Sequence, residues 1–154
     1  MRLLYSKPKL NNLSQGERIA FIRQFRKLTQ DDVSDMLHLT GECKRRTVTR
    51  YETNIRSPKE ERLKEISKIL FVDPIYIRNY DFKDNNDLVY LFLWLEELFP
   101  RIEIYLNTNN DELNNFFIKW NSIRKKRKNN KISYEDYVEW KLNYEFRKEK
   151  QNEN

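Results

Sequence analysis

The chain has 154 residues, with 30 Lys and Arg against 24 Asp and Glu, which gives a formal net charge of +6. Hydrophobic residues make up 38% and aromatic residues 14% of the chain, enough for a folded core in one domain or two small ones. One Cys (Cys43), one His (His38) and two Gly argue against internal disulfides, zinc sites and glycine-rich nucleotide loops, so no metal and no cofactor are expected. The longest apolar stretch, Leu88 to Leu95, is too short to span a bilayer, and no signal peptide is apparent, so we expect a cytoplasmic protein that does not contact a membrane.

Positive charge is concentrated in the first half of the chain. Residues 1–82 carry 17 Lys and Arg against 11 Asp and Glu, whereas residues 83–154 carry 13 of each. This asymmetry is expected where one half of a chain binds a polyanion. An excess of this size is also ordinary for a soluble domain, so the charge alone does not decide between the two interpretations.

Two helices are predicted before residue 40. The first covers residues 13–27, where Ser14 and Glu17 have the spacing of a capping box. The second follows Thr29, which has Asp32 at the corresponding position. Apolar residues at helical spacing follow each cap, namely Ile19, Ile22 and Phe25 in the first helix and Val33, Met36 and Leu37 in the second.

Three shorter helices are predicted between residues 44 and 78. The first covers residues 44–53 and carries Val48 and Tyr51 as core anchors among Arg and Thr side chains. The next begins at Pro58, because proline suits the first helical position. A fifth, short helix is predicted over residues 73–78.

The second half begins after a polar segment. Residues 81–87 are predicted to be a linker, which divides the chain into a domain of residues 1–82 and a module of residues 83–154. Residues 88–99 are apolar on nearly all sides and predict a helix that is buried on nearly all sides. Residues 101–106 alternate between apolar and polar side chains and predict a short β-strand.

Two more helices are predicted toward the end of the chain. One covers residues 113–128 and ends in the basic run from Arg124 to Lys128, which suits a helix C-terminus and could alternatively contact phosphate. The other opens with Ser133 and Asp136, which again have the spacing of a capping box.

Two short helices joined by a tight break, the second rich in Arg and Thr, are typical of a helix-turn-helix. A helix fits the DNA major groove, where Arg can donate two hydrogen bonds to a guanine. Separate blocks, in the right order between about residues 14 and 80, resemble the Xre/phage-repressor (Cro/C1-type) family. These blocks are Gly16-Glu17-Arg18-Ile19, Leu28-Thr29-Gln30-Asp31-Asp32-Val33, Thr47-Val48-Thr49-Arg50-Tyr51-Glu52 and Arg56-Ser57-Pro58.

The resemblance implies a mainly α fold, with a five-helix lambda-repressor-like domain over residues 1–82. A small helical module with one short strand is expected to follow it. The resemblance further implies that the helix around residues 44–54 binds double-stranded DNA, and that Glu52 pairs with a nearby Arg. The residues assigned to DNA are Gln30, Lys44, Arg45, Arg46, Thr47, Thr49, Arg50 and Lys59, of which Arg50 and Lys59 would contact phosphates.

The spacing before Val48 departs from the family pattern. Seven residues separate Thr40 from Val48, where the family usually has about three. Four extra residues correspond to about one helical turn. Either the third helix begins a turn earlier, or the turn is a longer loop.

A lone strand would leave its backbone groups unpaired. We expect residues 101–106 to pair with the same strand of a second copy, with residues 88–99 packed on that copy; a second strand near residues 1–5 remains an alternative partner. The resulting homodimer would bind an inverted repeat. The expected dimerisation residues are Leu91, Trp94, Leu95, Leu98, Ile102 and Ile104.

These features lead to two hypotheses of function. The first is a sequence-specific repressor of a phage or other mobile element, since 17 Asn and 16 Lys hint at an AT-rich genome. The second is an antitoxin-type module that binds a partner protein, either a toxin or a derepressor, through its C-terminal half. An enzyme is disfavoured and no catalytic residue is expected, because adjacent acids such as Glu96 and Glu97 point in different directions on a helix.

Overall fold

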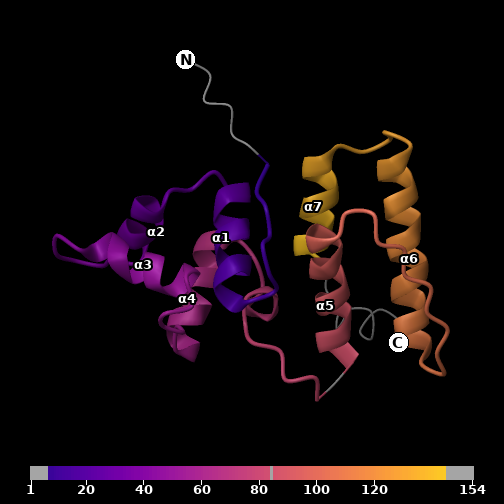
Figure 1. Cartoon of the computed structure of the whole chain (residues 1–154), viewed down its shortest axis with the longest axis horizontal. Coiled ribbons are helices and arrows are strands. Elements are labelled where there is room, and N and C mark those ends of the chain that lie inside the picture. Colours follow the sequence, from indigo (N-terminus) through magenta and orange to yellow (C-terminus); the bar gives the residue numbers. More distant parts are fainter. Residues whose placement is uncertain (1–6, 84, 145–154) are drawn as a thin grey trace, which may run out of the picture. The chain divides into compact units, whose positions relative to one another are not determined.

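The structure, a computed structural model, describes residues 7–83 and 85–144 and consists of helices and connecting segments in that part of the chain (Figure 1). Its contacts divide the chain into two compact units, Met1–Asn79 and Tyr80–Asn154. The predicted linker over residues 81–87 is partly wrong, because helix α5 begins at Asn85. Asp87 is 1% exposed and accepts hydrogen bonds from the backbone N–H groups of Asp81 and Phe82, so this carboxylate holds the segment that enters the helix.

Over its described residues, 7–79, the first unit contains four α-helices and a short 3-10 helix. They are α1 (Gln15–Phe25), α2 (Gln30–Met36), α3 (Lys44–Glu52), α4 (Glu60–Leu70) and the 3-10 helix η1 (Pro74–Tyr76). The predicted fifth helix is therefore shorter than expected. The apolar stripes of these helices supply the core, which includes Ile19, Ile22, Val33, Leu37, Val48, Tyr51, Leu63, Ile66, Leu70 and Tyr76.

The helix caps of this unit agree with the sequence in part. Thr29 and Asp32 form the complete capping box, in which each side chain accepts from the backbone N–H of the other residue. Ser14 accepts from the backbone of Glu17, but the Glu17 carboxylate instead accepts from Asn11. The predicted start of the fourth helix at Pro58 is wrong, because α4 begins at Glu60.

The second unit contains helices α5 (Asn85–Leu98), α6 (Asp111–Lys128) and α7 (Tyr134–Leu142). Figure 1 shows that α5 and α6 run in the same direction and that α7 runs back beside α6. The capping box of Ser133 with Asp136 is confirmed. Among the described residues, no helix combines the length and the apolar character needed to cross a membrane.

The predicted strand over residues 101–106 is wrong. Residues 102–108 form no regular secondary structure, and the described residues contain no strand at all. The segment runs back along α6, where a guanidinium N–H of Arg124 donates to the Ile102 carbonyl and Asn114 bonds to the backbone of Thr108 (Figure 1). The apolar and polar side chains alternate because Ile102 and Ile104 are half-buried on the side that faces the helix. The alternation does not reflect pairing with a neighbouring strand.

Glu96 lies at the centre of a buried polar cluster in the second unit. Its carboxylate is paired with Arg124 at 3.3 Å and with Lys141 at 3.5 Å, and it accepts hydrogen bonds from Trp120 and Tyr137. Burial, followed by the neighbouring Glu96 charge, raises the pKa of the Tyr137 hydroxyl above its usual range. The hydroxyl therefore stays protonated as a donor, and the cluster ties α5, α6 and α7 together.

Candidate nucleic-acid interface

The connection between α2 and α3 accommodates the four extra residues in two ways. Helix α3 begins at Lys44, one turn before the core anchor Val48. The chain before it projects as a loop from this unit (Figure 1). Within the loop, Gly41 has a φ of 94°, a conformation that favours glycine. The insertion therefore both extends the N-terminal end of α3 and lengthens the turn.

Helix α3 has one buried and one exposed face. Val48, Tyr51 and Glu52 are buried. Arg46 and Arg50 lie about half a helical circumference away from Val48 at 100° per residue, and both are exposed. Helix α3 therefore presents these two guanidinium groups away from the core of the unit.

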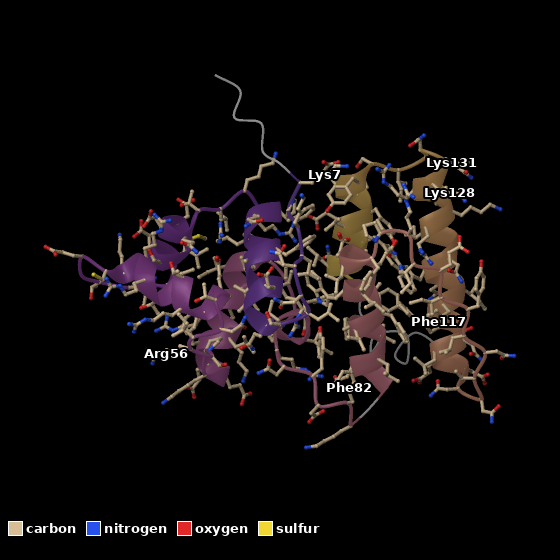
Figure 2. The ribbon with its side chains drawn as sticks, in the orientation of Figure 1. Lys7, Arg56, Phe82, Phe117, Lys128 and Lys131 are labelled. Atoms are coloured by element: carbon tan, nitrogen blue, oxygen red, sulfur yellow. The ribbon has the colours of Figure 1, made fainter. Side chains whose placement is uncertain are left out.

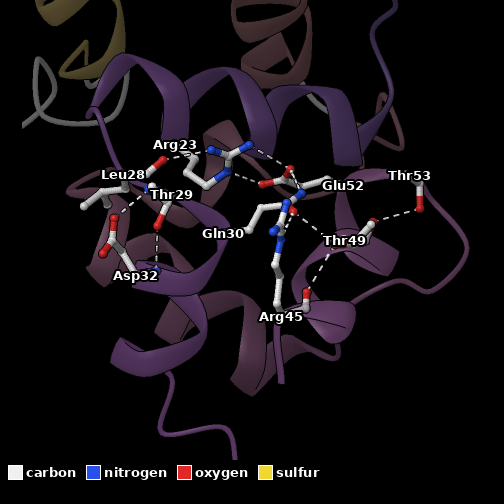
Figure 3. A network of polar contacts seen from close by, with 9 residues as sticks. All are labelled: Arg23, Leu28, Thr29, Gln30, Asp32, Arg45, Thr49, Glu52 and Thr53. Atoms are coloured by element: carbon white, nitrogen blue, oxygen red, sulfur yellow. Dashed lines mark hydrogen bonds and ion pairs between the residues drawn. The ribbon is translucent and has the colours of Figure 1, made fainter. Parts of the chain in front are cut away.

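Gln30, the first residue of α2, connects the two helices through its side-chain amide (Figure 3). Its Nε2 donates to Glu52 Oε2 at 2.8 Å. Its Oε1 accepts from Arg45 Nε at 3.0 Å and from the Thr49 hydroxyl at 3.1 Å. The structure thus brings together Gln30, Arg45 and Thr49, three of the residues that the sequence assigns to DNA.

The predicted pairing of Glu52 with an Arg is confirmed, and the partner is Arg23 of α1 (Figure 3). Arg23 Nε lies 2.5 Å from Glu52 Oε1, with side chains only 12% and 7% exposed. Arg23 also donates to the Leu28 carbonyl at 2.8 Å. Because the Glu52 carboxylate can only accept hydrogen bonds, the NH2 group of the Gln30 amide faces Glu52 and the amide oxygen of Gln30 faces Arg45. This indirect role of Glu52 was not apparent from the sequence, since the participants lie far apart along the chain.

The two cations at the start of α3 have acidic neighbours on α2. Lys44 forms an ion pair and hydrogen bond with Asp35, which raises the pKa of the Lys44 ammonium group. Arg45 is 63% exposed and lies 3.9 Å from Asp31. These contacts leave both groups at the surface but pull them toward α2 in the free protein.

Arg46 and Arg50 differ from these two cations, because their side chains form no ion pair with any described residue. The other two residues of α3 that the sequence assigns to DNA, Thr47 and Thr49, are half-buried. The exposed face of α3 therefore carries two uncompensated positive charges.

The structure does not bring Lys59 into this group. Lys59 precedes α4 and is exposed. It lines a separate hollow of about 380 Å³ together with Tyr51, Arg56 and Arg62, among others. Figure 2 shows Arg56 at the margin of this unit. Arg56 and Arg62 were not assigned to DNA from the sequence; the basic Arg56-Ser57-Pro58 motif was the available signal for the first.

The six predicted dimerisation residues lie in different surroundings of the second unit. Trp94 is buried, while Leu91 and Leu95 are half-buried on α5. Leu98 and Ile102 line an apolar hollow of about 670 Å³ with Phe99, Pro100 and Arg101, whereas Ile104 lines another groove. No cluster of metal-ligating side chains occurs among the residues that the structure describes.

The first unit has the helix order and the tight α2–α3 packing of a helix-turn-helix. Residues 19–77 match the family model described as helix-turn-helix, of the Xre/Cro/C1 type, in agreement with the motifs of the sequence. Comparisons with curated proteins and with solved structures find no match. The family is one of DNA-binding transcription regulators and is not typically enzymatic, so the chain contains the DNA-binding domain of a transcription regulator.

Proposed function

We propose that the protein is a sequence-specific transcriptional repressor that inserts α3 into the major groove of an operator. The observation that carries the proposal is the arrangement of Gln30, Arg45 and Thr49 around one amide oxygen. On DNA, the two Nη groups of Arg45 would donate to the edge of a guanine while its Nε keeps the bond to Gln30, and Gln30 would reach an adjacent base with the remaining N–H of its amide. Arg46 and Arg50, whose side chains form no ion pair with any described residue, would bind a further base edge and a phosphate, respectively.

The same arrangement gives a reason for specificity as well as affinity. Arg45 and Thr49 are held by Gln30, and Gln30 is held by Glu52, so the side chains that would reach the bases are ordered before DNA arrives. Ordering in advance lowers the entropic cost of binding. We therefore assign base contacts to Gln30, Arg45 and Thr49, and phosphate contacts to Lys44, Arg50 and Lys59. Arg46 and Thr47 complete the groove-facing surface.

We further propose that two copies bind together through the second unit. The half-buried side chains Leu91, Leu95, Leu98 and Ile102 and the exposed Phe99 offer the apolar surface for this contact. Two-fold pairing would place the two α3 helices on half-sites about 34 Å apart or a multiple of that distance. Binding of such a pair over a promoter would exclude RNA polymerase, and the Asn- and Lys-rich composition fits a phage or other mobile element.

The test is selection of bound duplexes from a random DNA library by the full chain. Enrichment of an inverted repeat with evenly spaced half-sites would support the proposal. The Arg45→Ala variant should then select a degenerate base at one position of each half-site. The proposal would be contradicted if the wild-type protein enriched no sequence, or if wild type and Arg45→Ala enriched the same sequence.

A further inference from the structure

The segment between α5 and α6 exposes backbone that no other part of the described chain uses. Residues 103–107 form no backbone hydrogen bond with any described residue. The segment is anchored only at its ends, by Arg124 at the Ile102 carbonyl and by Asn114 at Thr108. Residues 103 and 105–107 are exposed and Ile104 is half-buried, so this run of residues lies at the surface, where water or another chain must satisfy its N–H and C=O groups.

A groove of about 690 Å³ follows this segment along the last turns of α6. One wall comes from residues 100–105, and the other comes from α6, which ends near Lys128 in Figure 2. Glu96 and Tyr137 lie between the walls.

The charge that lines the groove is predominantly positive. The five cations are Arg101, Arg124, Lys125, Arg127 and Lys128, against the two acids Glu96 and Glu103. Both acids are already engaged, Glu96 by Arg124 and Lys141 and Glu103 by the Tyr105 hydroxyl.

Four of these cations form no ion pair with any described residue, namely Arg101, Lys125, Arg127 and Lys128. Cations at the end of α6 also favour the helix dipole, but that explanation does not extend to Arg101, which lies on the opposite wall. Uncompensated positive charge therefore faces the groove from both sides.

We propose that this groove binds an extended acidic segment of a partner protein. The segment would form backbone hydrogen bonds along residues 103–107, and its carboxylates would meet Arg101, Lys125, Arg127 and Lys128. Side chains of the opposite parity would rest on the apolar part of the lining, which includes Pro100 and Ile104. Addition of an extended peptide to unused backbone is an established mode of recognition, in which main-chain bonds give affinity and side-chain sites give specificity.

The unused backbone distinguishes a peptide from other anions. Duplex DNA would satisfy the cations, but it offers no regular row of donors and acceptors that matches residues 103–107. A small organic anion would likewise leave most of the backbone groups of residues 103–107 unused. The proposal does not depend on the function of α3, because the groove residues belong entirely to the second unit.

The experiment measures binding of a fluorescent peptide of about ten residues, alternating glutamate and valine, to the full chain by anisotropy. Lys125→Glu combined with Lys128→Glu should weaken this binding about tenfold, since two attractions become repulsions. The matched control is Lys126→Glu, because Lys126 is exposed in the same basic run but does not line the groove. Equal thermal unfolding midpoints of the variants would show that they fold.

A second peptide with N-methyl groups at alternate backbone nitrogens tests the hydrogen bonds directly and should also bind about tenfold more weakly. No binding of the first peptide, or equal losses with Lys126→Glu, would overturn the proposal. Undiminished binding of the N-methylated peptide would do so as well. If the paired reversals instead weaken binding to random duplex DNA and leave peptide binding intact, the groove is a DNA contact and the proposal is wrong.

Discussion

Gly16 lies where α1 meets the end of α3, and the two backbones approach closely there. A Cβ atom at this position would lie 2.4 Å from the Glu52 carbonyl oxygen and 2.5 Å from that of Tyr51. Its backbone N–H meanwhile donates to the Asn54 side chain at 2.9 Å. The absence of a side chain at Gly16 therefore sets how near α3 can lie to α1.

Gly16→Ala should lower the free energy of unfolding, although the same change inside an unobstructed helix raises stability by about 1 kcal/mol. The new methyl group would force two rigid carbonyls apart, and overpacking of this kind costs about 1–3 kcal/mol. Urea unfolding of the full chain measures the difference. Gln24→Ala, at an exposed position of the same helix, is the control and should be neutral or stabilising; a gain in stability for Gly16→Ala would refute the close contact.

Asp32 gives the first unit a specific dependence on pH. Hydrogen bonds from the backbone and the hydroxyl of Thr29 lower the pKa of its carboxyl group below the usual value. A carboxyl group with a lowered pKa in the folded state contributes stability above its unfolded pKa, and this contribution is lost as the pH falls through the folded value.

Asp32→Asn should therefore unfold at a lower temperature than wild type at neutral pH, and the gap should narrow below about pH 4. Thermal unfolding of both proteins across this range provides the measurement. Asp31→Asn, next to it in the sequence, leaves the capping box intact and should show a smaller gap at neutral pH. A gap for Asp32→Asn that stays constant down to strongly acidic pH would contradict the assignment.

At the scale of the helices, features that depend on neighbouring residues could be predicted and those that depend on distant partners could not. The capping boxes at Thr29 and Ser133 each need a residue three positions away, and both are present. Residues 101–106 have the alternation of a strand, but a strand also requires a second strand, and α6 occupies that side instead. Likewise, the type of partner for Glu52 could be predicted, but its position on α1 could not.

The predicted DNA-binding residues show the same limit. The sequence places Arg45, Arg46 and Arg50 on one helix, and their spacing alone separates an outward row from the core anchors. Which of them contacts Gln30 depends on how α2 packs against α3, and the four-residue insertion made that register uncertain. A longer helix and a longer loop have similar sequence signals, so the sequence could not show how the four extra residues are accommodated. The start of α3 at Lys44 in the structure answers this question.

Along α3, substitutions should separate sequence recognition from general attraction to DNA. Arg50→Ala should weaken binding to all duplexes alike and reduce the slope of log affinity against log salt by about 1, as expected for a lost phosphate contact. Arg45→Ala should instead cost about 1–3 kcal/mol of discrimination at one base pair. Titration of both variants with an operator and with a shuffled duplex makes the comparison.

Lys68→Ala is the matched control for these variants, because Lys68 is an exposed cation in the last turn of α4. It removes the same charge from the same unit and should leave both the affinity and the salt slope nearly unchanged. Losses as large as those of Arg50→Ala would mean that net charge, rather than the face of α3, governs binding.

At the scale of the whole molecule, the proposed dimer depends on the apolar hollow lined by Leu98 and Ile102. Leu98→Glu combined with Ile102→Glu should convert a dimer to a monomer in sedimentation at micromolar concentration, because each dimer would have to bury two charges per copy. Affinity for an inverted repeat should then fall by about 100-fold, since the half-sites would be bound independently. Ile118→Glu is the control, because Ile118 is 66% exposed and lies outside that hollow. A wild-type monomer, with and without DNA, would contradict the dimer.

The most direct test of the account is binding of the purified full chain to the intergenic DNA upstream of its own gene, titrated in salt with excess nonspecific competitor. We predict saturable binding that survives the competitor, maps to an inverted repeat and weakens with a slope of about −0.9 per phosphate neutralised. Arg45→Ala should reduce the advantage of this DNA over the competitor by about 1–3 kcal/mol per half-site. Two results would contradict the claim that α3 reads a specific sequence. One is binding that the competitor removes completely, and the other is an equal preference of wild type and Arg45→Ala for this DNA over the competitor.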